Sequence, residues 1–217
     1  RILRKKTVPT GASRPWQEIA ADMNALVKDL AEDEGIGLKE IAGVGLGVPG
    51  AVDLERGELI YAPNLPTCRH TPFRRCVEEA LGIPLYLDND ANVAALGESM
   101  FGAGGGQTRC SVMITLGTGV GGGVIIDGRI FAGAYHGGTE LGHLVIHEDG
   151  EPCGCGRKGC WEAYSSATGL IREGRKAAEK EPDSKLWELC GGDLERLDGK
   201  MIGDAVDLGD PAAERVM

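Results

Sequence analysis

Residues 136–162 read HGGTELGHLVIHEDGEPCGCGRKGCWE and hold the densest grouping of chemically active side chains in the sequence. Three thiols, Cys153, Cys155 and Cys160, lie within eight positions, and His143 lies just upstream. Thiolates are soft ligands, and three of them with one imidazole complete the tetrahedral coordination that zinc adopts in structural sites. The alternative, free thiols packed as small apolar groups, does not suit a polar, glycine-rich loop. The spacing therefore predicts a zinc site.

The spacing alone leaves the fourth ligand open. His143 and His147 are four residues apart on LGHLVIH, which has the pattern of a strand, so both would face the same side. His136 is farther from the thiols. Glycines between the thiols would let the backbone turn tightly enough to point the sulfurs inward, namely Gly154, Gly156 and Gly159.

Composition limits the class of protein. A chain of 217 residues with 42% apolar residues can form one large domain or two small ones with a proper core. The net charge of −10 argues against a nucleic-acid surface in this segment, and no apolar run approaches membrane-spanning length. The remaining four of the seven cysteines show no pairing pattern, so we expect reduced thiols and a cytoplasmic location.

Helical and strand patterns alternate through the first half of the chain and predict an α/β fold. Arg1–Thr10 has a strand pattern, and Ser13 is a candidate cap for a helix that Gly35 ends. The further expected elements are a strand over Ile41–Val48, a hairpin of Ala51–Asp53 and Glu58–Tyr61, a helix from Thr71-Pro72 to Gly82, a strand over Ile83–Leu87 and a helix around Val93–Gly97. The glycines of residues 102–106 suggest a domain boundary, so we expect domains over residues 1–105 and 106–217.

The second half begins with a predicted strand over Cys110–Leu116, followed by a loop over Gly117–Gly123 and a strand over Val124–Ile126. Asp127-Gly128 is a hairpin signal before a return strand over Arg129–Phe131. After the cysteine-rich segment we expect helices over Ala163–Lys180, Lys185–Leu189, Met201–Leu208 and Asp210–Met217, the last capped by Asp210.

A glycine-rich segment, TLGTGVGGG over residues 115–123, contains the formal pattern G-x-G-x-x-G. A dinucleotide fingerprint requires a strand, a turn and then a helix, but this segment continues into a second strand. We therefore predict a hairpin whose backbone N–H groups and Thr118 hydroxyl can hold phosphate groups. The alternative is a glycine turn with no ligand.

Three polar residues, Asp88, Asn89 and Asp90, follow a predicted strand. In an alternating α/β pattern, ligands bind outside the carboxyl ends of the strands. Helix capping is the alternative, because Asp and Asn are favoured caps, but capping accounts for one of the three residues.

Several of these motifs together resemble the ROK family of repressors, open reading frames and sugar kinases. The resemblance rests on GGTELGH, CGCGRKGCWE, DNDANVAALGE, GVPG and APNLP, in the family order. It implies an actin-like ATPase (ribonuclease H-like) fold with two α/β domains around a cleft. Two family elements, an N-terminal Asp-x-Gly-Gly-Thr hairpin and a C-terminal glycine-rich segment near adenosine, have no counterpart here. We therefore expect an internal segment of a longer kinase, incomplete at both ends.

The resemblance also implies roles for single residues. His143 becomes the fourth zinc ligand and a sugar contact, and Asp90 becomes the base that takes the proton of the attacking hydroxyl, with Asp88 structural. For Glu162 the alternative is an acid that favours the start of the following helix. The remaining implied sugar contacts are Gly50, Asn64, Asn89, Asp90, Glu140 and Glu162, and the implied phosphate-binding residues are Gly117, Thr118 and Gly119.

The activity implied is transfer of phosphate from ATP, with Mg²⁺, to a hexose, first of all glucose to glucose 6-phosphate, with Zn²⁺ structural. Alternatives are a sugar-responsive transcriptional repressor of the same family, a kinase for N-acetylhexosamines or fructose, and a non-catalytic sugar-binding module. We expect a homodimer or homotetramer, with no nucleic acid bound through this segment and no membrane contact.

Overall fold

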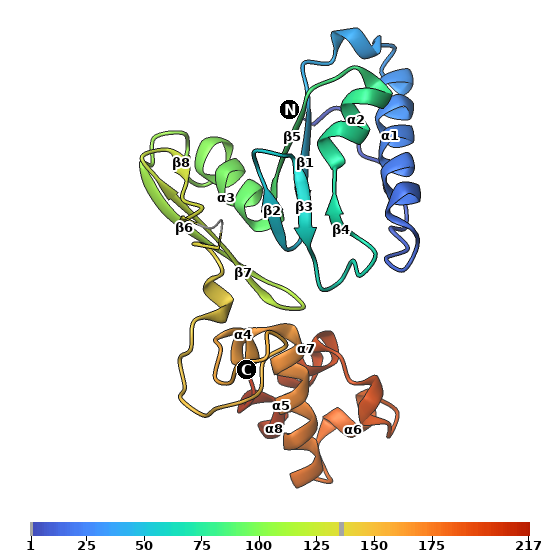
Figure 1. The fold of residues 1–217 in the computed structure, drawn as a ribbon. Coiled ribbons are helices and arrows are strands. Elements are labelled where there is room, and N and C mark those ends of the chain that lie inside the picture. The colour runs from blue at the N-terminus through green and yellow to red at the C-terminus, as the bar shows by residue number, and fades with distance from the viewer. Residues whose placement is uncertain (1, 135–136) are drawn as a thin grey trace. The chain divides into compact units, whose positions relative to one another are not determined.

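The computed structural model describes residues 2–134 and 137–217 (Figure 1). Contacts between residues divide the chain into two compact units. The first unit comprises residues 1–113 and 123–139, and the second comprises residues 114–122 and 140–217. The expected boundary between residues 105 and 106 stays a prediction, because the strands that follow it contribute to both units. His136, one of the candidate zinc ligands, lies outside the described residues.

A pair of parallel strands, β1 (Val44–Val48) and β5 (Leu85–Asn89), forms the centre of the first unit, with Gly47 opposite Asp88. Apolar side chains on one face of this pair join a core with the helices α1 (Trp16–Asp33) and α2 (Phe73–Leu81). Figure 1 shows α1 and α2 side by side along the sheet. Because successive side chains of a strand point to opposite faces, the alternate residues of β1 face the other way.

On that other face, Gly47 lets helix α3 (Asp90–Phe101) approach the sheet closely. A Cβ atom on Gly47 would lie 2.7 Å from a methyl carbon of Val93 and 3.3 Å from the Cα of Asp90. The third glycine of GVGLGVPG, Gly47, therefore lets the start of α3 lie against β1. The expected strand over Ile83–Leu87 is displaced by two residues, so Asp88 and Asn89 belong to β5 itself.

Two three-stranded antiparallel sheets complete the strand structure. β2 (Ala51–Asp53), β3 (Glu58–Tyr61) and β4 (Arg69–Thr71) confirm the first predicted hairpin and add an unpredicted strand. The other sheet has the order β6 (Cys110–Leu116), β7 (Val120–Ile126) and β8 (Arg129–Ile130). Asp127 and Gly128, both with positive φ, form the predicted turn.

Strand β7 begins at Val120, so the prediction of a loop over Gly117–Gly123 was wrong for its last four residues. A Cβ atom on Gly122 would lie 2.6 Å from a carbon of Leu141, and one on Gly123 would lie 2.3 Å from the Cβ of Ala95. These glycines permit close packing inside a strand and do not form a turn.

The N-terminal segment differs from its prediction. Residues 2–10 form no strand, because none of the described strands pairs with them. Instead, basic side chains hold the segment along α1: the Lys6 Nζ atom lies 2.7 Å from Asp33 Oδ2, and the Arg4 Nε atom lies 2.8 Å from Glu34 Oε1. Pro15, not Ser13, occupies the N-cap position of α1. Gly35, with φ +66°, follows the end of the helix as predicted, and a short 3₁₀ helix, η1 (Leu38–Glu40), comes next.

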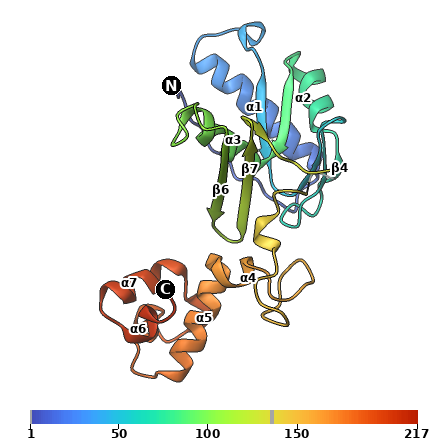
Figure 2. The same cartoon turned by 90° about the vertical axis from the view of Figure 1, so that its left-hand side faces the viewer.

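The second unit is largely helical beyond the cysteine-rich loop. Its elements are η2 (Leu141–His143), α4 (Glu162–Ser165), α5 (Ala167–Lys180), α6 (Lys185–Leu189), η3 (Leu194–Arg196), α7 (Gly199–Asp207) and α8 (Pro211–Glu214). Helices α5 to α8 surround a small core centred on Leu186, Ile202 and Ala212, and Figure 2 shows α5, α6 and α7 together. Ser166 caps α5 and so separates it from α4. Asp210 caps α8, as predicted.

The segment LGHLVIH is not the predicted strand. Leu141–His143 form a 3₁₀ turn, and the pairing that follows is a single bridge between Val145 and Cys160. His143 and His147 therefore do not share a strand face. The Nδ1 atom of His147 lies 3.0 Å from the carbonyl oxygen of Glu148, and His147 is not among the residues that converge with the thiols.

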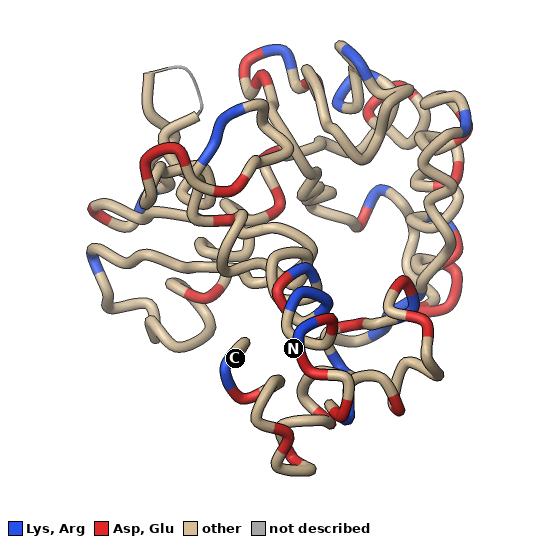
Figure 3. The backbone as a smooth tube through the Cα atoms, turned by 90° about the horizontal axis from the view of Figure 1, so that it is seen from below, with Lys and Arg blue, Asp and Glu red and all other residues tan. Residues whose placement is uncertain are grey.

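Acidic and basic residues are interspersed along the chain (Figure 3). None of the helices in the described part of the chain is long and apolar enough to span a bilayer.

Candidate functional site

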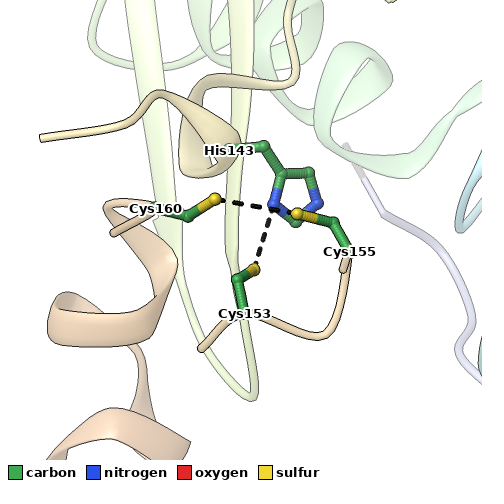
Figure 4. Close-up of side chains that lie close together, drawn as sticks. All are labelled: His143, Cys153, Cys155 and Cys160. Carbon is green, nitrogen blue, oxygen red and sulfur yellow. Dashed lines mark hydrogen bonds between the residues drawn. The ribbon is translucent and has the colours of Figure 1, made fainter. Parts of the chain in front are cut away.

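Four side chains in the second unit converge as the sequence predicted, and we call them the Cys/His cluster: His143, Cys153, Cys155 and Cys160 (Figure 4). Their ligand atoms all lie within 4.8 Å of one another. The His143 Nδ1 atom is 3.6 Å from Cys153 Sγ, and the Sγ atoms of Cys155 and Cys160 are also 3.6 Å apart. Tetrahedral zinc, with Zn–S of about 2.3 Å and Zn–N of about 2.0 Å, holds its ligand atoms roughly 3.5–3.8 Å apart. The cluster therefore fits zinc in donor type and spacing.

Two of the three loop glycines are required by the backbone that forms the cluster. Gly156 and Gly159 have φ of +87° and +75°, where other residues are strained. A Cβ atom on Gly159 would lie 1.6 Å from the His147 carbonyl oxygen, so the backbone itself passes there. Gly154 has neither feature: its φ is not positive and nothing lies within 4 Å of where a Cβ would be. The expectation that all three glycines shape the loop was wrong for Gly154.

The thiols differ in how easily they ionise. Burial, and then the neighbouring thiols, raise the pKa of Cys153 to about 12. Burial also disfavours the thiolate of Cys155, but hydrogen bonds from the backbone and side chain of Arg157 and from the other two thiols lower its pKa to about 6. Cys155 is exposed, whereas Cys160 is fully buried. Because the thiolate is the form that binds a metal ion, binding at the cluster would release the proton of Cys153.

The acidic segment of the first unit is held by regular structure. Asn89 caps α3: its Oδ1 atom accepts hydrogen bonds from the backbone N–H groups of Ala91 (2.9 Å) and Asn92 (3.2 Å). Its Nδ2 atom donates to the carbonyl oxygen of Gly50 at 3.2 Å. The capping alternative is thus correct for Asn89, whose amide group retains one N–H for a ligand.

Asp88 and Asp90 differ in the hydrogen bonds that their carboxylates accept. Asp88 Oδ1 accepts from the Asn89 backbone N–H (2.7 Å) and from Asn92 Nδ2 (3.0 Å), which agrees with a structural role. Asp90 is exposed at the first position of α3, and one of its oxygens, Oδ1, accepts from the Ala91 backbone N–H at 2.9 Å. Its Oδ2 atom has no partner among the described residues. Asp90 is therefore the more exposed of the two acids, and it accepts fewer hydrogen bonds than Asp88.

Sequence reasoning missed two buried residues behind this segment. Asn92 Oδ1 accepts a hydrogen bond of 3.0 Å from the hydroxyl of Thr139, and both side chains are about 95% or more buried. Thr139 belongs to the motif GGTELGH, so this bond ties that motif to α3. The signal was present as a polar residue at a core position of the helix pattern, since a buried amide requires a partner.

The other expected sugar contacts differ in how firmly the structure holds them. Asn64 is exposed in a turn, and Gly50, with φ +86°, would place a Cβ atom 2.2 Å from the Tyr61 carbonyl oxygen. Glu140 is exposed before η2, and its carboxylate has no partner in the described part of the chain. Glu162 is the first residue of α4, and its Oε2 atom accepts from the Val120 backbone N–H at 3.0 Å.

The expected phosphate-binding residues, Gly117, Thr118 and Gly119, form the turn between β6 and β7, as predicted.

The fold is of the actin-like ATPase type, α/β in both expectation and structure, as its structural neighbours show. The ROK family model matches residues 1–217, and the chain belongs to this family. The crystal structure of a ROK family glucokinase from Streptomyces griseus in complex with glucose and AMPPNP superimposes with a TM-score of 0.80 and 38% identity. The match covers 100% of this chain and 67% of that one.

Curated relatives include both enzymes and regulators. Glucokinase of Thermotoga maritima is 36% identical over 210 residues, which are 97% of this chain and 64% of the relative. The xylose repressor of Caldicellulosiruptor bescii is 36% identical over 152 residues, 69% of this chain and 38% of the repressor. The chain thus spans less than two thirds of the length of these relatives.

Proposed function

We propose that the protein transfers the γ-phosphoryl group of ATP to a hydroxyl group of a hexose, with glucose 6-phosphate formed from glucose. The observation that carries this proposal is the match of the whole chain, at 38% identity, to a glucokinase crystallised with glucose and an ATP analogue. The match to the glucokinase of Thermotoga maritima over 97% of the chain supports the same activity.

In this proposal Asp90 is the general base. A sugar hydroxyl is a weak nucleophile, and a carboxylate within hydrogen-bond reach can accept its proton as the bond to phosphorus forms. The free Oδ2 atom of Asp90, at the exposed start of α3, suits that task, while Asn89 and Asp88 fix the backbone around it. The substrate contacts we propose are Gly50, Asn64, Asn89, Asp90, Glu140, His143 and Glu162.

The turn Gly117–Gly119 is the proposed phosphate site. Phosphoryl transfer depends mainly on positioning and charge stabilisation, and Mg²⁺ would arrive with ATP and bridge its phosphates. Backbone N–H groups in the turn can bind phosphate oxygens without side-chain hindrance at Gly117 and Gly119.

Zinc is the proposed occupant of the Cys/His cluster, where it would supply structural cross-linking of the loop. His143 Nδ1 faces the thiols, which leaves Nε2 for a second partner. A metal ligand at one ring nitrogen fixes the tautomer, so Nε2 would carry the proton and donate to a sugar oxygen.

The test is a coupled assay of ADP release by the longest natural form of the protein, with Mg-ATP and a panel of glucose, mannose, fructose and N-acetylglucosamine. We expect the highest kcat/KM with glucose. Sugar binding by calorimetry without any ADP release would exclude the kinase and leave the non-catalytic module.

A transcriptional repressor is the second candidate, because xylose repressors match up to 69% of the chain. Sugar-dependent release of operator-like DNA by the longest natural form, without turnover, would favour it. We also propose a homodimer or homotetramer located in the cytoplasm, and light scattering on the purified protein tests the assembly.

A further inference from the structure

The turn Gly117–Gly119, which we call the glycine turn, is held by its carbonyl groups. The Gly117 oxygen accepts from the Ala167 backbone N–H at 2.8 Å, and the Thr118 oxygen accepts from the Thr168 hydroxyl at 2.8 Å. The Gly119 oxygen accepts from the Gly117 N–H at 2.9 Å. All three carbonyl oxygens, which would repel a phosphate, are thus engaged by the protein.

The N–H groups of Thr118 and Gly119 have no hydrogen-bond partner within the described residues. The next N–H along, that of Val120, does have one, the Oε2 atom of Glu162 at 3.0 Å. Glu162 can reach it because position 119 is glycine: a Cβ atom there would lie 2.3 Å from the same oxygen. The carboxylate therefore binds the backbone at the point where the turn ends and β7 begins.

The second oxygen of the same carboxylate faces the Cys/His cluster. Glu162 Oε1 lies 3.6 Å from Cys153 Sγ, and Glu162 follows the buried ligand Cys160 by two residues. Gly142, next to His143, also lies close to Val120, since a Cβ atom on Gly142 would be 2.0 Å from the Val120 carbonyl oxygen. Gly142, next to His143, and Glu162, two residues after Cys160, thus both contact the buried first residue of β7.

We propose that Glu162 is a positioning residue that anchors the glycine turn to the Cys/His cluster, so that metal in the cluster holds the turn's free N–H groups in place. The description of the turn as a phosphate site rests on the proposed function; the anchoring does not. The role differs from the sugar contact expected of Glu162, because Oε2 holds the Val120 N–H group of the turn while Oε1 faces Cys153 of the cluster.

Amide hydrogen exchange at Val120, followed by NMR on the zinc-loaded chain, tests the anchor directly. Glu162→Ala removes the acceptor and should speed exchange at Val120 roughly tenfold, the scale of a hydrogen bond to a charged group. Glu162→Gln keeps a carbonyl oxygen and should stay within about threefold of the unchanged chain, by the same reasoning. Glu140→Ala is the matched control, because Glu140 is also an expected sugar contact but has no contact with the turn.

Zinc removal by a chelator should speed exchange at Val120 in the unchanged chain and add little in Glu162→Ala, because the link is already cut there. If Glu162→Ala does not fold, Gly119→Ala provides the same test, since its Cβ displaces the carboxylate without removing it. Equal acceleration by Glu140→Ala, or Val120 exchange unchanged in Glu162→Ala, would overturn the proposal. Neither readout requires turnover, so failure of the anchor and failure of the kinase proposal are distinguishable.

Discussion

The two groups of candidate functional residues, one part in each unit, are built in different ways. In the first unit, Asp88–Asn92 lie at the junction of β5 and α3, where a strand register, a helix cap and a buried Asn92–Thr139 bond set every backbone position. In the second unit, the Cys/His cluster lies on a loop with isolated bridges and two glycines at positive φ. Regular structure can hold the first part without a ligand, whereas the second part lacks such a framework and would depend on its metal.

The largest expected effect is a loss of catalytic rate, caused by a substitution at Asp90 in the first unit. Asp90→Asn keeps the size and the position of the side chain but removes the base, so kcat of the longest natural form should fall by roughly 10²–10⁴. Sugar affinity and zinc content should change little, because the β5–α3 junction does not depend on this charge. The measurement is steady-state kinetics with metal analysis. A kcat within about threefold of the unchanged enzyme, far below a general base's usual contribution, would transfer the role to another residue.

The next largest effect is a loss of stability, caused by a substitution in the cysteine-rich loop. Gly159→Ala forces a Cβ atom against the His147 carbonyl oxygen at a positive φ, and we expect a loss of roughly 2–4 kcal/mol in unfolding free energy, together with weaker zinc binding. Gly154→Ala is the matched control in the same loop and should be nearly neutral. Denaturant unfolding and zinc competition measure both variants. Similar losses in the two variants would mean that the loop backbone differs from the one described here.

A smaller effect tests whether metal dependence is confined to the loop. Asp210 is 3% exposed, and its two oxygens accept from the backbone N–H groups of Ala213, in α8, and Lys185, in α6. Asp210→Asn turns one acceptor into a donor that faces the Lys185 N–H, so unfolding free energy should fall by about 1–3 kcal/mol. Asp198→Asn, at an ordinary N-cap, should cost less than about 0.5 kcal/mol, because Asn caps as well as Asp. Both values should be the same with and without zinc.

The pH dependence of this unit follows from the same carboxylate. Burial disfavours its ionised form, but the hydrogen bonds from Ala213 and Lys185 outweigh burial and lower the pKa of Asp210 below its usual value. A lowered pKa in the folded state means that the stabilisation is complete above the unfolded pKa, about 3.9, and is lost as the pH falls through the folded value. Unfolding followed between pH 6 and pH 2 should show this loss in the unchanged chain, and a smaller one in Asp210→Asn.

Much of this arrangement could be predicted from the sequence. Spacing of soft ligands predicted that the three thiols form a metal site, whereas the fourth ligand, His143, came from the family resemblance. Turn residues predicted the Asp127-Gly128 hairpin and the helix end at Gly35, because positive φ is a local property. The family order of motifs predicted the fold. Roles in catalysis, in contrast, stay predictions.

The errors arise where tertiary packing decides. The sequence around Gly122 and Gly123 was interpreted as a loop because it is rich in glycine. In the structure these positions lie in β7, where Leu141 and Ala95 pack so closely that a side chain would not fit. Residues 2–10 had a strand pattern but have no strand beside them, and LGHLVIH is bent by its bonds to the cysteine-rich loop. Glu162 shows the same limit at the site, since its contact with Val120 joins residues 42 positions apart.

The most direct test of the difference between the two parts is a map of amide hydrogen exchange over the whole chain, with zinc bound and after chelation, with metal analysis before and after. We predict about one zinc per chain, as a single Cys₃His site requires. After chelation, protection should fall over residues 141–162 and the glycine turn and should persist over β5 and α3. Either of two results would contradict the claim that the loop depends on metal and the β5–α3 junction does not. One is the absence of bound zinc with all thiols free to react, and the other is an equal loss of protection at β5 and α3.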